Sequence, residues 1–419
     1  MKRISPDQLR LAPYIQPGSS IFVGHSTAEP ATLLEALVTQ RADFPHSRLT
    51  MHASFSGIVR PEHVDGLRIE GLSGLGTQQQ LVQADAIELI PTHLSDFGRM
   101  IAQGESPVDV ALLSVSQPDA QGRFSLGLVN DYMGEAARRA RIVIAEMNSA
   151  MPFTHGGPFL MADRIDLLVP TERAIHEFPP GQVRPTDRAI AQIVASYIGD
   201  GSILQFGVGS VPDGIALSLQ GFRDIGIHSG LISDPIRALI NSGVVTNARK
   251  PIDTGITVGG AVWGTRALYD FVHDNPAIHV RPLSYTHAPE TFAQLPGFVS
   301  VNSALEVDLS GQANLEAVGG RYVGAIGGAV DFVRGARLAP GGRSIVALPA
   351  TGGKGAFSRI VTRLDGPVTI ARSDIDTVVT EFGSAELRGQ TLRERARRLI
   401  AIAHPDFREA LERDFTDGR

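Results

Sequence analysis

The sequence of 419 residues contains no cysteine, which excludes disulfide bonds, thiolate metal sites and a cysteine nucleophile. No stretch approaches the ~20 consecutive apolar residues of a membrane-spanning helix. The Lys2-Arg3 pair near the start precedes no long apolar run of the kind found in secretory signals. The formal net charge of −6 gives no overall attraction to nucleic acid. We therefore expect a cytoplasmic protein with neither a membrane nor a nucleic acid as partner.

The length and the spacing of apolar runs predict two α/β domains. Single hydrophobic cores rarely extend beyond ~250–300 residues, so this chain is expected to divide. Short apolar runs recur in its first half at 19–24, 48–55, 109–116 and 141–148. A helix-like pattern follows the first run, over 30–40. This alternation is typical of a buried, mainly parallel β-sheet covered by helices.

The same order of elements starts again in the second half. Residues 201–219 repeat the order of 18–37: a Gly-Ser pair, an apolar strand, a glycine-containing turn, then a proline seven residues before a leucine. A proline-rich segment over 177–187 separates the two halves. We therefore expect two similarly built domains, 1–188 and 189–419.

Three glycine-containing turns are candidates for a catalytic or anion-binding site. GHSTA (24–28) nearly matches the Gly-x-Ser-x-Gly elbow of serine hydrolases, but too few residues precede it for the strands that the elbow requires, so we interpret it as a strand-to-helix turn. Lys354 follows two glycines but precedes Gly355, which excludes a P-loop and still allows an anion site. In the turn over 205–212, glycines at 207 and 209 can expose amide groups to an oxygen or a phosphate.

No histidine spacing indicates a metal, and we expect none. The carboxylates considered as nucleophile or base are Glu29, Glu62, Glu146, Glu306, Glu316 and Glu381. Glu62 lies in a glycine- and proline-containing loop directly after the apolar run 48–55. A residue in such a position enters a crevice at a sheet edge.

Long blocks of the C-terminal half resemble the acetyl-CoA hydrolase/transferase family, the class I coenzyme A transferases of 4-hydroxybutyrate, acetate and butyrate type. These blocks are 232–250, 301–320, 324–336, 347–361 and 378–407. The resemblance extends to 28–37, 92–97 and 144–156, and so spans nearly the whole chain.

The resemblance implies two α/β domains with an active-site cleft between them, a homodimer, and coenzyme A as substrate with no permanently bound cofactor. It implies a ping-pong reaction in which a glutamate attacks an acyl-CoA and becomes a glutamyl-CoA thioester, which the incoming acid then opens. By position, the coenzyme A and oxyanion contacts fall on Gly207, Val208, Gly209, Ser210, Val211, Gly324, Gly328 and Lys354.

One position departs from the family. The turn that reads His-Thr-Glu in the usual members, where the glutamate is the nucleophile, reads His228-Ser229-Gly230 here. We expect that Glu62, or else Glu29, replaces the missing carboxylate, and that the space at Gly230 beside His228 admits the acyl group of a short acid such as butyrate, 4-hydroxybutyrate or itaconate. Two alternatives remain open: an acyl-CoA hydrolase that activates water through a carboxylate or His228, and a binding protein without activity.

Overall fold

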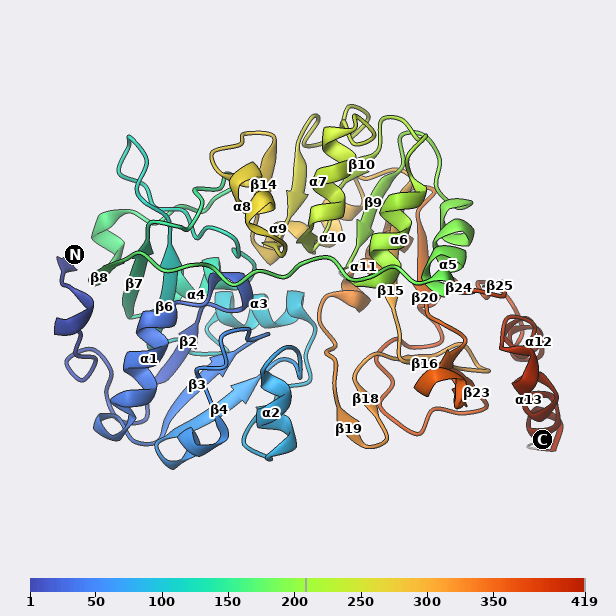
Figure 1. Cartoon of the computed structure of the whole chain (residues 1–419), viewed down its shortest axis with the longest axis horizontal. Helices are drawn as coiled ribbons and strands as arrows, with labels where there is room; N and C mark the ends of the chain where they lie inside the picture. The colour runs from blue at the N-terminus through green and yellow to red at the C-terminus, as the bar shows by residue number, and fades with distance from the viewer. Residues whose placement is uncertain (208, 418–419) are drawn as a thin grey trace. The chain divides into compact units, whose positions relative to one another are not determined.

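The computed structural model describes residues 1–207 and 209–417, which form two compact units (Figure 1). Unit 1 contains residues 1–179 together with 258–286, and unit 2 contains the remaining described residues. The units differ from the continuous domains expected from the sequence, because the chain enters unit 2 at residue 180 and returns to unit 1 for 258–286. No helix in the described part of the chain is long and apolar enough to cross a membrane.

Unit 1 is built on an eight-stranded sheet in the order β1-β8-β7-β6-β2-β3-β4-β5, and every neighbouring pair is parallel. The strands are β1 Lys2–Arg3, β2 Ser20–Val23, β3 Ser47–Met51, β4 Leu67–Gly71, β5 Glu88–Leu89, β6 Val110–Val115, β7 Ile142–Asn148 and β8 Leu167–Thr171. The helices are α1 Ala31–Thr39, α2 Gln78–Gln83, α3 Leu94–Gln103, α4 Met133–Arg139, α8 Arg266–Val272 and α9 Leu283–Thr286. The predicted strands at 19–24, 48–55, 109–116 and 141–148 are confirmed as β2, β3, β6 and β7.

The apolar runs are continuous because both faces of this sheet are buried. Successive side chains of a strand point to opposite faces, so Ile21 and Val23 enter one hydrophobic cluster while Phe22 enters another. Strand β6 divides in the same way, with Leu112 in the first cluster and Leu113 in the second. Each face is thus covered by its own core.

Glu146 on β7 is a structural residue that holds the first turn of α1. Its carboxylate accepts hydrogen bonds from the amides of Thr32 and Leu33, at 2.8 and 3.3 Å, and from the hydroxyls of Thr32 and Thr171, at 3.1 and 3.0 Å. A carboxylate at this position satisfies amide groups that have no partner inside the helix, and it complements the helix dipole. Of the six candidate carboxylates, Glu146 therefore has a structural role.

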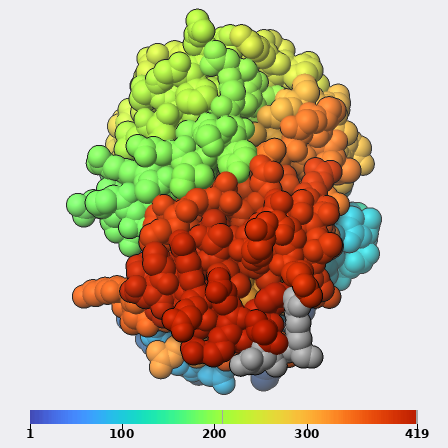
Figure 2. Space-filling model, turned by 90° about the vertical axis from the view of Figure 1, so that its right-hand side faces the viewer, coloured from blue at the N-terminus to red at the C-terminus, as the bar shows by residue number. Residues whose placement is uncertain are grey.

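Unit 2 has a six-stranded sheet in the order β10-β9-β15-β20-β24-β25, parallel except for the last pair. Its strands are β9 Ile203–Phe206, β10 Gly226–Ile227, β15 Phe298–Ser303, β20 Arg343–Ala347, β24 Thr377–Thr380 and β25 Gly383–Glu386. Its helices are α5 Pro185–Ala195, α6 Ser210–Ser218, α7 Asp234–Asn241, α10 Pro289–Phe292, α11 Ala329–Leu338, α12 Leu392–Ala401 and α13 Pro405–Asp417. Figure 2 shows the face of this unit that carries α12 and α13, in red.

Seven further short strands in the described part of unit 2 lie in the segment between β15 and β24: β16 Glu306–Asp308, β17 Ala313–Asn314, β18 Ala317–Val318, β19 Arg321–Tyr322, β21 Thr351–Gly352, β22 Phe357–Ser358 and β23 Ile360–Val361. Another, β11 Leu231–Ile232, follows β10. Both units are α/β with mainly parallel sheets, so the predicted fold class is confirmed. The repeated order of elements corresponds to β2 followed by α1 in unit 1 and to β9 followed by α6 in unit 2.

We expect Glu146→Ala to lower the free energy of unfolding by roughly 3 kcal/mol, because buried hydrogen-bond donors lose their acceptor. Urea unfolding followed by far-ultraviolet circular dichroism measures the change. The matched control is Glu35→Ala on α1, where the carboxylate pairs with Arg173 at the surface and the expected loss is below about 1 kcal/mol. Equal losses in the two variants would contradict the structural role of Glu146.

Candidate functional site

Glu29 joins the loops that follow β2 and β3 in unit 1. Its Oε1 accepts a hydrogen bond from Ser54 Oγ at 2.6 Å, and its Oε2 accepts the amides of Phe55 and Ser56 at 2.9 and 2.8 Å. Because β2 and β3 are parallel neighbours, the two loops leave the same edge of the sheet, the edge where α/β enzymes place their sites. Glu29 is only 9% exposed, so its charge depends on these three donors rather than on water.

The buried position changes the acidity of this carboxyl. Burial raises the pKa of Glu29, and the hydrogen bonds from Ser54, Phe55 and Ser56, with the nearby His176, offset only part of that rise. A carboxylate with a raised pKa binds protons more strongly and is a better nucleophile once ionised.

Three aromatic side chains lie beside this carboxylate. The rings of Phe55 and Phe178 stack with centroids 5.5 Å apart, and Trp263 contacts them at 5.2 and 5.5 Å. The amide of Phe55 is itself a donor to Glu29. The loop that binds the carboxylate therefore carries an aromatic ring that packs against two others.

A buried polar chain lies beneath the turn that carries Glu29. His25 Nε2 contacts Asp131 Oδ2 at 2.7 Å, and His25 Nδ1 contacts Ser26 Oγ at 3.0 Å. Burial raises the pKa of Asp131, but the charge and hydrogen bond of His25 and the amide of Met133 outweigh it, and the pKa lies below its usual range. Asp131 is therefore ionised and fixes the His25 ring.

The Ser26-His25-Asp131 order resembles a hydrolase triad, but its burial gives it a structural role. Ser26 is fully buried and adopts a φ of +51°, which is a strained conformation. The hydrogen bond that its amide donates to the Ala53 carbonyl helps to hold this conformation. A nucleophile must reach its substrate, and this hydroxyl does not reach the surface. The chain of contacts instead orders the turn that precedes Glu29.

His52 completes this layer in a neutral form. Its ring lies 5.1 Å from that of His25 in an edge-on arrangement. Burial, followed by the charge of His25, lowers the pKa of His52 to about 3. Sequence reasoning missed His25, His52 and Asp131, because 106 residues separate His25 from Asp131 and no spacing motif connects them.

Glu62, the nucleophile expected from the sequence, lies on a short 3₁₀ helix over Pro61–Asp65. Its side chain is 61% exposed, and Arg60 is its ion-pair partner at 3.9 Å. A carboxylate in this position is solvated, unlike that of Glu29. Its role remains a prediction.

The glycine turn after β9 leads into α6 as the sequence suggested. Gly209 has a φ of +121° and caps the helix that begins at Ser210, and Val211 and Pro212 lie in its first turn. The amides at the start of this helix have no partner inside it, which suits an anion or a polarised oxygen. Val208 lies outside the described residues.

Gly230 lies beside two ring-bearing side chains. A Cβ atom at this position would lie 3.2 Å from Phe332 Cε2 and 3.6 Å from His287 Cε1. His228 is fully buried, with its ring 5.8 Å from that of Phe292. Within unit 2, Phe332 and His287 thus border the half-buried Gly230 on one side, and the acyl space expected there stays a prediction.

Two of the glycines expected to contact coenzyme A, Gly324 and Gly328, are closely packed, whereas a Cβ at Gly207 or Gly209 would meet nothing within 4 Å. A Cβ at Gly328 would lie 2.3 Å from His287 Nε2, and one at Gly324 would lie 2.0 Å from the Leu315 carbonyl oxygen. The structure thus brings Gly230 and Gly328 together around His287. Lys354 is exposed and has a φ of +60° in a tight turn over Gly353–Gly355.

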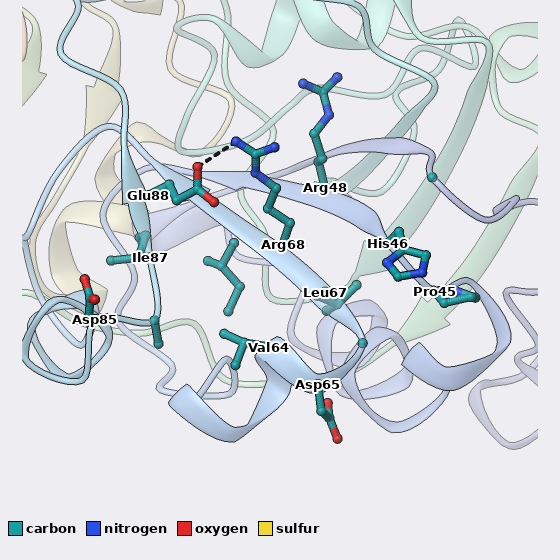
Figure 3. A pocket seen from close by; sticks show the side chains of 14 residues that line it. Pro45, His46, Arg48, Val64, Asp65, Leu67, Arg68, Asp85, Ile87 and Glu88 are labelled. Atoms are coloured by element: carbon teal, nitrogen blue, oxygen red, sulfur yellow. Dashed lines mark hydrogen bonds and ion pairs between the residues drawn. The ribbon is translucent and has the colours of Figure 1, made fainter.

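A hollow of about 660 Å³ lies near the amino ends of β3 and β4, next to β5, at the opposite end of these strands from Glu29 (Figure 3). Arg48 and Arg68 point into the same region, but Arg68 binds Glu88 at 2.6 Å and both arginines approach Glu70. The cations are already neutralised by carboxylates. We therefore place the candidate site at Glu29 rather than here.

Comparisons with known proteins match both halves of the chain. The acetyl-CoA hydrolase/transferase N-terminal domain model matches residues 2–172, and the corresponding C-terminal domain model matches 264–415. A 4-hydroxybutyrate coenzyme A transferase of Clostridium kluyveri is 38% identical over 405 residues, which cover 96% of this chain and 94% of that protein.

Solved structures agree in fold over the whole chain. RipA from Yersinia pestis is 34% identical with a TM-score of 0.94, and the match covers 100% of this chain and 97% of that one. A 4-hydroxybutyrate CoA-transferase from Porphyromonas gingivalis is 33% identical with a TM-score of 0.83, covering 100% and 98%.

We expect Gly230→Glu to destabilise the protein by about 1–3 kcal/mol, because the new Cβ would lie 3.2 Å from Phe332 Cε2 and the ring must shift to accommodate it. Thermal unfolding measures this loss. In a double-mutant cycle with Phe332→Ala, the pair should be less destabilised than the sum of the two single variants, since the smaller side chain makes room. Strict additivity would show that residue 230 and Phe332 do not compete for the same space.

Proposed function

Because this chain belongs to the acetyl-CoA hydrolase/transferase family, we propose that it is an acyl-CoA:carboxylate CoA-transferase. The substrates proposed are short-chain acids such as butyrate, 4-hydroxybutyrate or itaconate and their coenzyme A thioesters. The similarity to 4-hydroxybutyrate coenzyme A transferases over nearly the full length supports this reaction class.

The proposed reaction proceeds through an enzyme-bound glutamyl-CoA thioester. A glutamate carboxylate attacks the acyl-CoA carbonyl carbon, and the C–S bond breaks. This step forms an acyl–glutamyl anhydride and expels the coenzyme A thiolate. The thiolate then attacks the glutamyl carbonyl and releases the first acid as a carboxylate. The second acid reverses both steps, so no proton or redox partner is consumed.

We propose a carboxylate of unit 1 as the nucleophile, and the burial of Glu29 is the observation that carries this choice. Both intermediates react with water, so a transferase needs a nucleophile from which water is excluded. Glu29 is 9% exposed, whereas the Glu62 side chain is 61% exposed. Geometry therefore favours Glu29, and Glu62 is kept as the competing candidate.

The donors to Glu29 also support this role. Ser54 and the amides of Phe55 and Ser56 hold the carboxylate in one orientation. When the carboxylate becomes part of the anhydride or the thioester, the same donors face oxygens of the glutamyl carbonyl group. They stabilise the negative charge that develops there. Positioning and electrostatic stabilisation thus come from one loop.

For unit 2 we propose that the start of α6 and the glycine-containing loops contact coenzyme A. The residues are Gly207, Val208, Gly209, Ser210, Val211, Gly324, Gly328 and Lys354. Helix amides without a partner inside the helix, and an exposed lysine, suit the polar and phosphate groups of coenzyme A. Homodimer formation is likewise proposed from the family.

We expect Glu29→Gln to lower the exchange of coenzyme A between butyryl-CoA and acetate by about 10³-fold or more, and Glu62→Gln to change it less than about 3-fold. The glutamine suits the site, because its oxygen can accept both amides while its NH₂ group donates to Ser54 Oγ. A circular dichroism spectrum and a melting temperature equal to those of the unaltered protein would show that the Glu29→Gln variant is correctly folded.

Borohydride trapping of the thioester, followed by peptide mapping, identifies the nucleophile directly. Modification of Glu29 is the expected result. Modification of Glu62, or loss of exchange in Glu62→Gln alone, would assign the reaction to that residue. Free coenzyme A without exchange would indicate a hydrolase, and intact butyryl-CoA bound without turnover would indicate a binding protein.

The raised pKa of Glu29 predicts the pH dependence of the exchange. The nucleophile must be ionised, so kcat/KM should fall as the pH drops through the pKa of Glu29 in the free enzyme. Since burial raises that pKa, the fall should begin at a higher pH than for a solvated glutamate with the ordinary value of 4.5. Initial rates between pH 4 and 8 test this. A profile that is flat down to the ordinary glutamate range would contradict Glu29 as nucleophile.

A further inference from the structure

Trp263, the one tryptophan of the chain, is buried with an unused hydrogen-bond donor. The residue is 7% exposed, and its Nε1–H has no acceptor among the described residues. Buried indole N–H groups usually have a partner, because leaving such a donor unpaired is unfavourable. The acceptor is therefore expected from outside the described part of the chain.

The main chain fixes Trp263 next to the turn that carries the proposed nucleophile. The Val262 carbonyl accepts the Thr27 hydroxyl at 2.8 Å, and the Gly264 carbonyl accepts the Phe178 amide at 2.8 Å. These bonds flank Trp263 on both sides in sequence. The indole is thus held against Phe178 and the turn that precedes Glu29.

The three rings of Phe55, Phe178 and Trp263 form an apolar wall, and Phe55 connects this wall to the loop that binds the carboxylate. Phe55 belongs to both features, because its amide donates to Glu29 while its ring contacts Trp263. A short acyl chain attached to the Glu29 carboxyl would leave it alongside this wall. Contact with the rings suits the methylene groups of the acyl chain, and the indole N–H is the polar group of this wall.

We propose that Trp263 is a specificity-determining residue whose Nε1–H donates a hydrogen bond to a hydroxyl or oxo oxygen on the acyl chain. The proposal rests on the CoA-transferase function proposed above and narrows its substrate class to short acids with such an oxygen. A second carboxylate is disfavoured, because Glu29 already contributes a negative charge to this desolvated region. A site built to bond an oxygen also discriminates against the analogue that lacks it.

The test compares two acyl groups that differ only in a terminal hydroxyl, 4-hydroxybutyryl-CoA and butyryl-CoA, with acetate as acceptor. In the unaltered protein kcat/KM should favour the hydroxylated substrate. In Trp263→Phe, which keeps an aromatic ring and removes the donor, the preference should fall by about 2- to 10-fold, the value of one neutral hydrogen bond. The readout is the ratio of the two kcat/KM values, because a loss of ring contact lowers both substrates alike.

The matched control is Phe178→Leu, which alters the wall without touching the donor and should affect both substrates alike. If Trp263→Phe also lowers both substrates equally, the indole has only a packing role and the proposal is overturned. A preference of the unaltered protein for butyryl-CoA overturns it without any variant. Absence of exchange with both substrates would instead refute the proposed function.

Tryptophan fluorescence gives a second readout that does not depend on turnover. Because Trp263 is the sole tryptophan, its emission reports on this place alone. Titration with free 4-hydroxybutyrate should shift the emission, while butyrate at equal occupancy, measured by calorimetry, should shift it less. Identical shifts would indicate that a water molecule, rather than the substrate oxygen, accepts the indole hydrogen bond, and would overturn the proposal.

Discussion

The carboxylate of Glu29 is bound by one hydroxyl and two main-chain amides of the loop that follows β3, and the carboxyl edge of the unit 1 sheet is organised around this contact. A buried charge is stable only when its hydrogen-bonding capacity is met. Meeting it with Ser54, Phe55 and Ser56 joins two loops from neighbouring strands. The aromatic ring of Phe55 is placed by the same contact that places its amide.

The layer beneath this contact explains why the turn before Glu29 keeps its shape. Ser26 has a strained backbone, and such strain persists only where the surroundings impose it. The ionised Asp131 fixes His25, which contacts the Ser26 hydroxyl, while the neutral His52 fills the remaining volume without adding charge. The Thr27 hydroxyl adds a bond to the Val262 carbonyl. Polar groups that resemble catalytic machinery therefore serve here to hold a turn in place.

The sequence predicted the strands well because they are buried on both faces, which produces continuous apolar runs that are easily recognised. The return of 258–286 to unit 1 had no comparable signal, since a segment's residues carry no mark of the sheet that they pack against. The exposure of Glu62 could not be read from the sequence for the same reason, and its role as nucleophile stays a prediction. The glycine- and proline-containing loop after β3 also supplies the amides of Phe55 and Ser56 that bind Glu29.

The packing around Gly230 is related to the absence of a carboxylate from this turn of unit 2. The turn that reads His-Thr-Glu in usual family members ends here in a glycine, and the rings of Phe332 and His287 contact the position that a side chain would occupy. Gly328 is packed against His287 as well, so three positions are adjusted to one another. A side chain at residue 230 requires the Phe332 ring to shift by a few tenths of an ångström, whereas His287 lies at ordinary contact distance. The turn therefore fits a glycine closely, and the glutamate proposed in its place, the buried and hydrogen-bonded Glu29, lies in unit 1.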